Sequence, residues 1–239
     1  MNASENPYAP SNFTMAAHAE SSERATFITR TYMHLAGAIL AFIGLEAVLL
    51  NSPIAERLTN TMMGGQYSWL IVLGAFMAVS WIANSWAMSS TSRGMQYAGL
   101  SLYVVAESII ILPLLYIAAS NPRFAGVIPT ASYTTLALFG VLTAIVFITR
   151  QDFSFMRSVL VFGGIAAMGL IVCAILFSFA LGPIFTYAMI ALACGYILYS
   201  TSNVMLHYRT DQYVAASLAL FAAVALLFWY ILQLFMSRD

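Results

Sequence analysis

Seven long apolar runs constrain this chain more than any other feature of its sequence. Each run is about 20 residues or longer, which is the length of helix that crosses the hydrocarbon of a bilayer. The runs cover approximately residues 27–50, 68–88, 95–119, 129–149, 155–180, 183–206 and 212–236. Most connections between them are short and carry turn-forming residues, so consecutive helices are expected to be antiparallel neighbours. The sequence therefore predicts an all-α membrane protein with seven transmembrane helices.

The composition agrees with lipid as the main solvent. Hydrophobic residues make up 62% of the chain and charged residues 8%, whereas a soluble domain has roughly 45–50% and about 25%. The net charge is zero, which argues against a nucleic-acid partner. The chain has no lysine, so a retinal Schiff base is excluded. Cys173 and Cys194 lack CxxC spacing and are predicted to be packing residues, and no cofactor or metal site is expected.

The ends of the chain and its arginines predict the topology. Residues 1–26 are rich in Ser, Asn, Ala and Pro and are expected to form a disordered cytoplasmic tail before the transmembrane domain of residues 27–236. The first loop, residues 51–67, is longer than the others and is expected to be irregular. One side of the membrane would carry Arg24, Arg30, Arg93, Arg150, Arg157 and Arg209, and the other Arg57, Arg123 and Arg238. The positive-inside rule then places the N-terminus in the cytoplasm.

A polar segment, Ser200 to Gln212, separates the last two apolar runs. The run that follows it begins with alanines four residues apart, at Ala215, Ala219 and Ala223. Small residues at this spacing let helices approach one another closely in a membrane. We therefore expect this half of the last helix to be packed by several neighbours and not to face lipid.

Glu107 lies near the middle of the third run, where a carboxyl group is costly. Six residues later, Pro113 cannot donate a hydrogen bond to the carbonyl of Ile109. Two interpretations stay open for Glu107. It is either a neutral, hydrogen-bonded side chain that locks helices together, or part of an ion path or proton-binding site.

Other polar residues in the runs have simpler explanations. Glu46 and His34 are near opposite ends of the first run, where interfacial water is expected to reach them. Asn84, with Ser80 and Ser85, is expected to form hydrogen bonds between helices.

A short aromatic turn follows the fourth run, with Arg150, Asp152, Phe153 and Phe155 at the expected cytoplasmic interface. Arginines and aromatic rings favour this depth, so topology alone could explain the pattern. The intramembrane protease motifs HExxH, GxGD and Gly-x-Ser-x-Gly are absent from the sequence. The chain is therefore not expected to be an enzyme.

Three segments resemble one family, the Bax-inhibitor (transmembrane Bax inhibitor motif) proteins. Residues 103–116 (YVVAESIIILPLLY) are similar to the family's third helix, residues 149–155 (TRQDFSF) to its TxxDFSF turn, and residues 195–203 (GYILYSTSN) to the end of its sixth helix. The triplet Thr201–Asn203 and the terminal Ser237–Asp239 resemble the bacterial YccA-like branch.

The resemblance implies seven helices with the seventh at the centre, wrapped by the other six. Many members carry one aspartate at the end of the sixth helix and another in the seventh. That pair is thought to sense pH and to close a calcium-permeable path near the cytoplasmic face. Here the two positions are Ser200 and Ala223. A serine and an alanine cannot share a proton as two carboxyl groups do, so this gate would lack its titrating pair.

The YccA-like branch is associated with binding and restraining an FtsH-type membrane protease. The resemblance thus implies a multi-pass protein of the bacterial inner membrane that modulates membrane-protein quality control and has no catalytic activity. The alternative is a calcium or cation leak channel that retains Glu107 but has weakened pH gating. The expected partners are the lipid bilayer and either such a protease or calcium and other cations.

Overall fold

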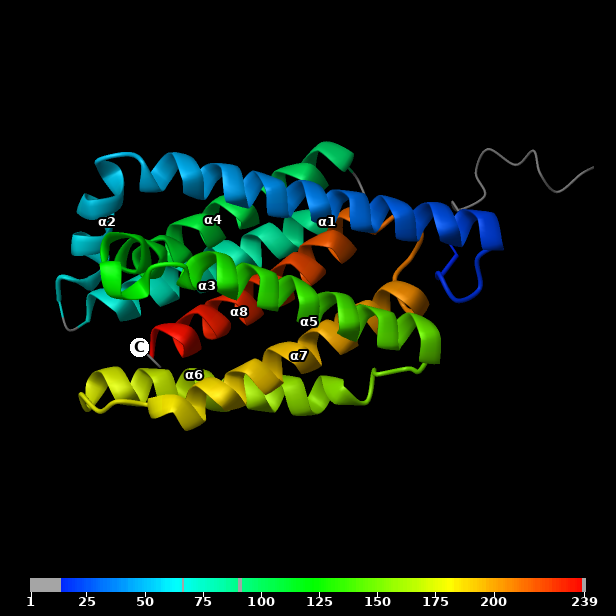
Figure 1. The fold of residues 1–239 in the computed structure, drawn as a ribbon. Helices are drawn as coiled ribbons and strands as arrows, with labels where there is room; N and C mark the ends of the chain where they lie inside the picture. The colour runs from blue at the N-terminus through cyan, green and yellow to red at the C-terminus, as the bar shows by residue number, and fades with distance from the viewer. Residues whose placement is uncertain (1–13, 66, 90–91, 238–239) are drawn as a thin grey trace, which may run out of the picture.

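The fold is a bundle of long helices. The computed structural model describes residues 14–65, 67–89 and 92–237, and Figure 1 shows how the helices are arranged. They are α1 (Ser21–Leu50), α2 (Ile54–Met63), α3 (Ser68–Ala87), α4 (Arg93–Ser120), the 3₁₀ turn η2 (Pro122–Phe124), α5 (Val127–Thr149), α6 (Met156–Leu176), α7 (Gly182–Leu206) and α8 (Tyr213–Met236). Within the described residues, seven helical segments are long and apolar enough to cross a membrane. The predicted class, an all-α membrane protein with seven transmembrane helices, is confirmed.

The last helix, α8, lies at the centre of the bundle (Figure 1). In its most apolar stretch 78% of the residues are buried inside the protein, against 17% for α1 and 11% for α3. It packs against α1, α3, α4, α5 and α7. In contrast, α6 packs mainly against α7 and reaches α8 through Ala167 and Tyr230. The expected central position of the seventh transmembrane helix is thus confirmed, with α6 as its most peripheral neighbour.

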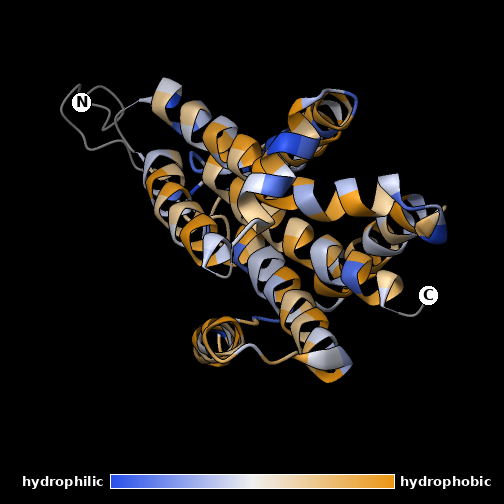
Figure 2. Cartoon of the chain, turned by 90° about the vertical axis from the view of Figure 1, so that its left-hand side faces the viewer, coloured by the Kyte–Doolittle hydropathy of each residue, from blue (hydrophilic) through white to orange (hydrophobic). Residues whose placement is uncertain are grey.

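Apolar residues predominate along the long helices, as Figure 2 shows by residue hydropathy, and many of them lie on the outside of the bundle. Large side chains such as Trp81, Ile148 and Ile184 are exposed, and exposure of this kind suits contact with lipid tails. Cys173 on α6 is also exposed, while Cys194 on α7 is partly buried, and both are free thiols. The expectation that both cysteines are packing residues is therefore wrong for Cys173.

The first loop is not irregular as expected, because it contains α2. Pro53 at the N-cap, with φ of −65°, starts the helix in a conformation that proline prefers. The buried residues are Ala55, Thr59 and Met62, spaced four and three apart, which defines one apolar helical face. That face docks onto α3 and α4. The segment is too short to span a bilayer, so a search for long apolar runs does not find it. The sequence signal for this helix is its amphipathic spacing.

The N-terminal segment is structured from residue 14, so the expected disordered tail of residues 1–26 is corrected in its second half. The helix α1 begins at Ser21, and Ala16 is fully buried. The backbone N–H of Ala16 donates to the carbonyl of Tyr208 over 2.9 Å. Hydroxyls of Thr14 and Thr210 both donate to the carboxylate of Glu23. These bonds tie the segment to the α7–α8 connection; residues 1–13 lie outside the described residues.

Candidate functional site

A cavity of about 680 Å³ lies beside α8. Its walls come from α3, α4, α6, α7 and α8, and most of them are apolar. The lining residues with a hydroxyl, amide or carboxyl group are Ser80, Asn84, Tyr103, Glu107, Tyr196, Tyr199, Ser200 and Tyr230. A large pocket with a few convergent polar groups is the usual form of a binding site. The cavity therefore defines the candidate functional site.

Glu107 is the acidic side chain of this lining. It is 7% exposed, and its Oε2 atom is buried without a hydrogen-bond partner among the described residues. The carboxyl group interacts with the hydroxyl of Tyr103, one turn earlier on α4. A carboxyl at this depth is expensive unless it faces a polar interior or a hydrated space. Of the two interpretations left open by the sequence, the position on a cavity wall favours the ion-path or proton-binding one.

The structure brings the two gate positions to the same cavity. Ser200, near the end of α7, and Ala223, in the middle of α8, both line it together with Glu107. The serine and the alanine are 6% and 5% exposed. Glu107 thus supplies the carboxyl group of the space that these two positions line.

The alanine column of α8 is divided between two environments. Ala215 is packed in the core, as expected. Ala219 and Ala223 instead line the cavity, as does Ala222. Ala223 is nevertheless 5% exposed and belongs to the buried core, so the expectation that this half of the helix is packed by several neighbours is confirmed. The cavity beside it is what the sequence did not predict.

The expected interhelical hydrogen bonds of the polar residues of α3 hold in part: Ser80 interacts with the hydroxyl of Tyr103 on α4, whereas Ser85 does not reach another helix. Ser85 donates to the carbonyl of Trp81 on its own helix, and Ser80 and Asn84 line the cavity. Tyr196 and Tyr199 also line it and were not singled out from the sequence. Tyr196 lies one helical turn before Ser200 and Tyr199 lies one residue before it. This proximity to Ser200 is the sequence signal that could have identified them.

Two side chains of α1 behave differently from each other. Glu46 was expected to be reached by interfacial water, but it is 4% exposed and both of its carboxylate oxygens lack partners among the described residues. This expectation is wrong, because α1 packs against α2, α4 and α8 along its length. His34 is half-buried, so solvent reaches it only in part, and its Nε2 lies 3.1 Å from the hydroxyl of Tyr97.

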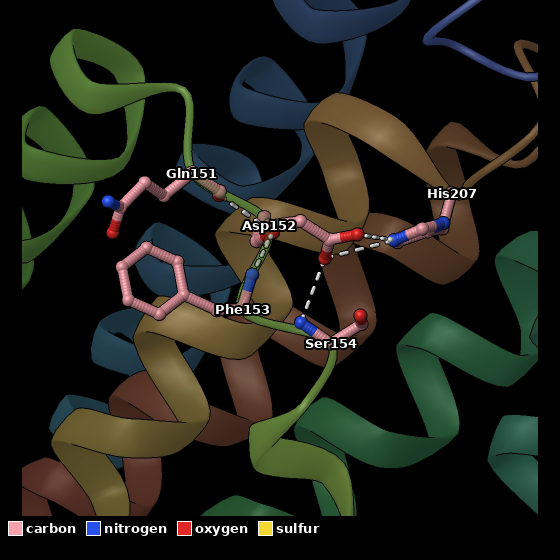
Figure 3. A network of polar contacts seen from close by, with 6 residues as sticks. Gln151, Asp152, Phe153, Ser154 and His207 are labelled. Carbon is pink, nitrogen blue, oxygen red and sulfur yellow. Dashed lines mark hydrogen bonds and ion pairs between the residues drawn. The ribbon is translucent and has the colours of Figure 1, made fainter.

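The aromatic turn after α5 is a separate structure from the cavity (Figure 3). Arg150 adopts a left-handed conformation, with φ of 52°, and closes α5 by donating to the carbonyl of Val146. The backbone N–H of Phe153 donates to the hydroxyl of Ser202 over 3.0 Å, and that hydroxyl donates to the carbonyl of Gln151. These bonds fix the turn to the end of α7.

Asp152 completes this connection. One carboxylate oxygen accepts the backbone N–H of Ser154 over 2.8 Å, and both lie within hydrogen-bonding distance of Nε2 of His207, at 3.2 and 3.1 Å. The Ser154 N–H and the neighbouring imidazole lower the pKa of Asp152 below its usual value. The sequence did not predict the pairing with His207, because the two residues are 55 positions apart. Phe155 points out of the turn and is 73% exposed.

These features define the class: a multi-pass helical membrane protein whose central last helix borders a largely apolar cavity with one buried carboxyl group. Among residues 14–65, 67–89 and 92–237, no three metal-ligating side chains gather closely enough to hold a metal ion. The chain belongs to the Bax inhibitor-1 family, since the model of the family described as "Inhibitor of apoptosis-promoting Bax1" matches residues 24–239.

Two relatives are similar over nearly the whole chain. Bax inhibitor 1 of Schizosaccharomyces pombe is 24% identical over 241 residues, which covers 97% of this chain and 85% of the yeast protein. The uncharacterized protein PA2604 of Pseudomonas aeruginosa is 26% identical over 227 residues, covering 92% and 93% of the two chains.

Proposed function

We propose that this chain provides a cation leak path, for calcium or other cations, in which Glu107 is the binding group. The single observation that carries the proposal is the position of the Glu107 carboxyl on the wall of the 680 Å³ cavity, with one oxygen unpartnered among the described residues. Intramembrane carboxyl groups that face an interior space mark ion and proton pathways.

The chemistry of the lining supports weak binding. Calcium prefers six to eight oxygen ligands, whereas this cavity offers one carboxylate together with hydroxyl and amide oxygens such as those of Ser200 and Asn84. Conduction needs a site that a cation enters readily and leaves readily. One carboxylate among neutral oxygens suits that requirement better than a tight cage would.

The proposal also includes weak pH gating. With Ser200 and Ala223 in the gate positions, no pair of carboxyl groups is available to couple its protons there. Glu107 alone would titrate as one group, and its response to pH would be shallower than that of a coupled pair.

Flux measurements on the purified protein in liposomes test this function. Calcium entry is followed with a trapped indicator at about pH 6 and about pH 8. Wild-type flux should exceed that of empty vesicles, and Glu107→Gln should lower it at both pH values. Ser108→Ala is the matched control, since its hydroxyl bonds within α4 to Val104. Wild-type flux no greater than that of empty vesicles would reject the proposal.

A second candidate function is the modulation of an FtsH-type protease in a bacterial inner membrane, with the N-terminus in the cytoplasm. The resemblance of the triplet Thr201–Asn203 to the YccA-like branch supports this second function. Ser202 of the triplet also holds the aromatic turn in place, through the hydrogen bond from the backbone N–H of Phe153. The anchored turn presents Phe155 at the end of the bundle that would face the cytoplasm.

The test for this candidate is co-purification with the protease in mild detergent and a changed rate of substrate degradation. Deleting residues 1–13 keeps every described contact and asks whether the protease engages that end. Phe155→Ala asks whether it engages the turn. Loss of association in either variant would support the candidate, and no association of the wild-type protein would remove it.

A further inference from the structure

A second, smaller pocket lies at the end of the bundle where α1 and α4 begin. Its volume is about 340 Å³. It is formed by the first turns of α1, the start of α4 and the connection between α7 and α8, with lining residues Ser22, Glu23, Thr26, Phe27, Arg30, Arg93, Thr210, Asp211 and Tyr213. No residue of this lining belongs to the cavity around Glu107.

Two guanidinium groups converge in this pocket. The Cζ atoms of Arg30 and Arg93 lie 5.7 and 5.8 Å from the centre of the Tyr213 ring, which is a cation–π distance for both. Within the described parts of the chain, neither arginine forms a salt bridge with a carboxylate. Two like charges at one aromatic ring repel each other unless an anion lies near them. Arginine is the side chain best matched to phosphate oxygens.

The floor of the pocket is held in place by a chain of hydrogen bonds across three helices. Arg93 donates to the hydroxyl of Tyr213 over 2.9 Å, and that hydroxyl lies 3.2 Å from the hydroxyl of Tyr97. Tyr97 in turn contacts Nε2 of His34, whose Nδ1 lies 2.7 Å from the carbonyl oxygen of Arg30. The ring of Tyr213, which both arginines contact, is 4% exposed, so packing holds it in place together with these hydrogen bonds.

Two carboxylates, those of Glu23 and Asp211, also line the pocket. Asp211 accepts two hydrogen bonds from Arg209 at 3.1 Å each, and Glu23 accepts the hydroxyls of Thr210 and Thr14. These bonds hold the carboxylates in position and leave Glu23 without a cation in a salt bridge among the described residues. The pocket therefore contains both cationic and anionic side chains.

We propose that this pocket binds the phosphoethanolamine headgroup of a phospholipid. The phosphate would lie between Arg30 and Arg93, and the primary ammonium would face Glu23 and Asp211. Arg93 is the first residue of the membrane-spanning helix α4, and Arg30 lies in the first third of α1, at the same end of the bundle. Arginines favour the depth of lipid headgroups. A volume of 340 Å³ is within the range of small-molecule sites and accommodates a headgroup of this size.

Native mass spectrometry of the purified full-length chain tests the proposal. The protein is titrated with phosphatidylethanolamine, phosphatidylcholine and phosphatidylglycerol that have the same acyl chains. The ethanolamine lipid should bind most tightly, since choline has no N–H to donate and glycerol has no cation. The variant Arg30→Gln with Arg93→Gln should bind it about tenfold or more weakly, which is the loss expected for charged hydrogen bonds. Arg157→Gln is the matched control, an exposed arginine at the same end outside the pocket.

Further measurements test the ammonium site and the identity of the ligand separately. Glu23→Gln should reduce the preference for phosphatidylethanolamine over phosphatidylcholine and leave phosphatidylglycerol binding unchanged. Soluble phosphoethanolamine, added at the same concentrations, should bind more weakly than the lipid; equal or tighter binding would show that the ligand is the free phosphate ester. Equal affinity for the three lipids, or undiminished binding by the double arginine variant, would overturn the proposal.

Discussion

The two faces of α8 use small side chains in opposite ways. On one face Ala216 and Ser217 are both 0% exposed, and the hydroxyl of Ser217 donates to the carbonyl of Thr31 on α1 over 2.8 Å. On the other face Ala219 and Ala222 border the 680 Å³ cavity. We name these the packed face and the cavity face.

The difference shows that a small residue permits close approach but does not cause it. On the packed face, α1 and α4 supply side chains that fill the space, among them Phe27 and Leu100. On the cavity face, α6 packs mainly against α7, so the alanines border a hollow. The packing of the neighbouring helices therefore determines whether a small side chain of α8 lies in a close helix contact or beside a cavity. Here it separates a structural face of α8 from a candidate functional face.

The largest expected effect comes from enlarging one alanine on each face. Ala216→Leu should destabilise the protein by about 1–3 kcal/mol or more, because the site has no room for three further carbon atoms. Ala222→Leu should leave stability nearly unchanged and lower cation flux by filling the cavity. Thermal unfolding in detergent and liposome flux measure the two effects. Equal destabilisation by both substitutions would erase the distinction between the faces.

A second substitution tests the wall that α3 and α4 form opposite the cavity face. A Cβ atom on Gly99 would lie 2.5 Å from the carbonyl oxygen of Ala83, so Gly99→Ala must push the two helices apart. We expect a loss of about 1–3 kcal/mol in unfolding free energy. Gly74→Ala on α3 is the control, since nothing lies within 4 Å of its Cβ position and little change is expected. If the two variants have the same stability, α3 and α4 are not in close contact.

Introducing acids at the gate positions sharpens the role of the cavity face. In the variant Ser200→Asp with Ala223→Asp, two carboxyl groups would share the cavity with Glu107 and their titrations would be coupled. As the pH is lowered and both carboxyl groups gain or share protons, the flux of the double variant should fall severalfold. Its dependence on pH should be steeper than that of the wild type. Each single substitution is the control and should give a shallower response. An unchanged pH profile in the double variant would show that these positions do not act on the path.

The smallest expected effect is at the aromatic turn, away from both faces. The lowered pKa of Asp152 means that its contribution to stability is present above the usual carboxyl pKa of 3.8 and is lost as the pH falls through the depressed value. Because the pair is exposed, Asp152→Asn should cost less than about 1 kcal/mol at neutral pH. The variant and the wild type should converge in acid. His207→Gln and the double variant complete a thermodynamic cycle, and additive effects would contradict a direct interaction.

Much of the fold could be predicted from the sequence because lipid demands long apolar helices with satisfied backbones. The seven spans follow from that requirement, and the small residues at the start of the last one indicated its burial. What the sequence could not supply depends on contacts between distant segments. Asp152 and His207, or Ala16 and Tyr208, meet only when the bundle forms.

The site was predictable in its residues but not in its shape. Glu107 could be identified from the sequence because a carboxyl group is energetically costly inside a membrane. Ser200 and Ala223 could be identified from the family resemblance. Their common cavity depends on where α6 packs, and the periodicity of α6 itself does not encode that position. Glu46 shows the reverse case, since its distance from the helix end suggested water, whereas its neighbours bury it.

We infer that the cavity face of α8 borders a space that water and cations can enter. Cysteine labelling tests this directly. In a background with Cys173→Ala and Cys194→Ala, Ala222→Cys and Ala216→Cys are exposed to a charged, membrane-impermeant thiol reagent, which reacts with the hydrated thiolate. We expect the thiol at position 222 to be modified at least severalfold faster than the thiol at position 216, and we expect Ala222→Leu, measured in parallel, to lower the flux. Equal and negligible labelling at both positions would contradict it.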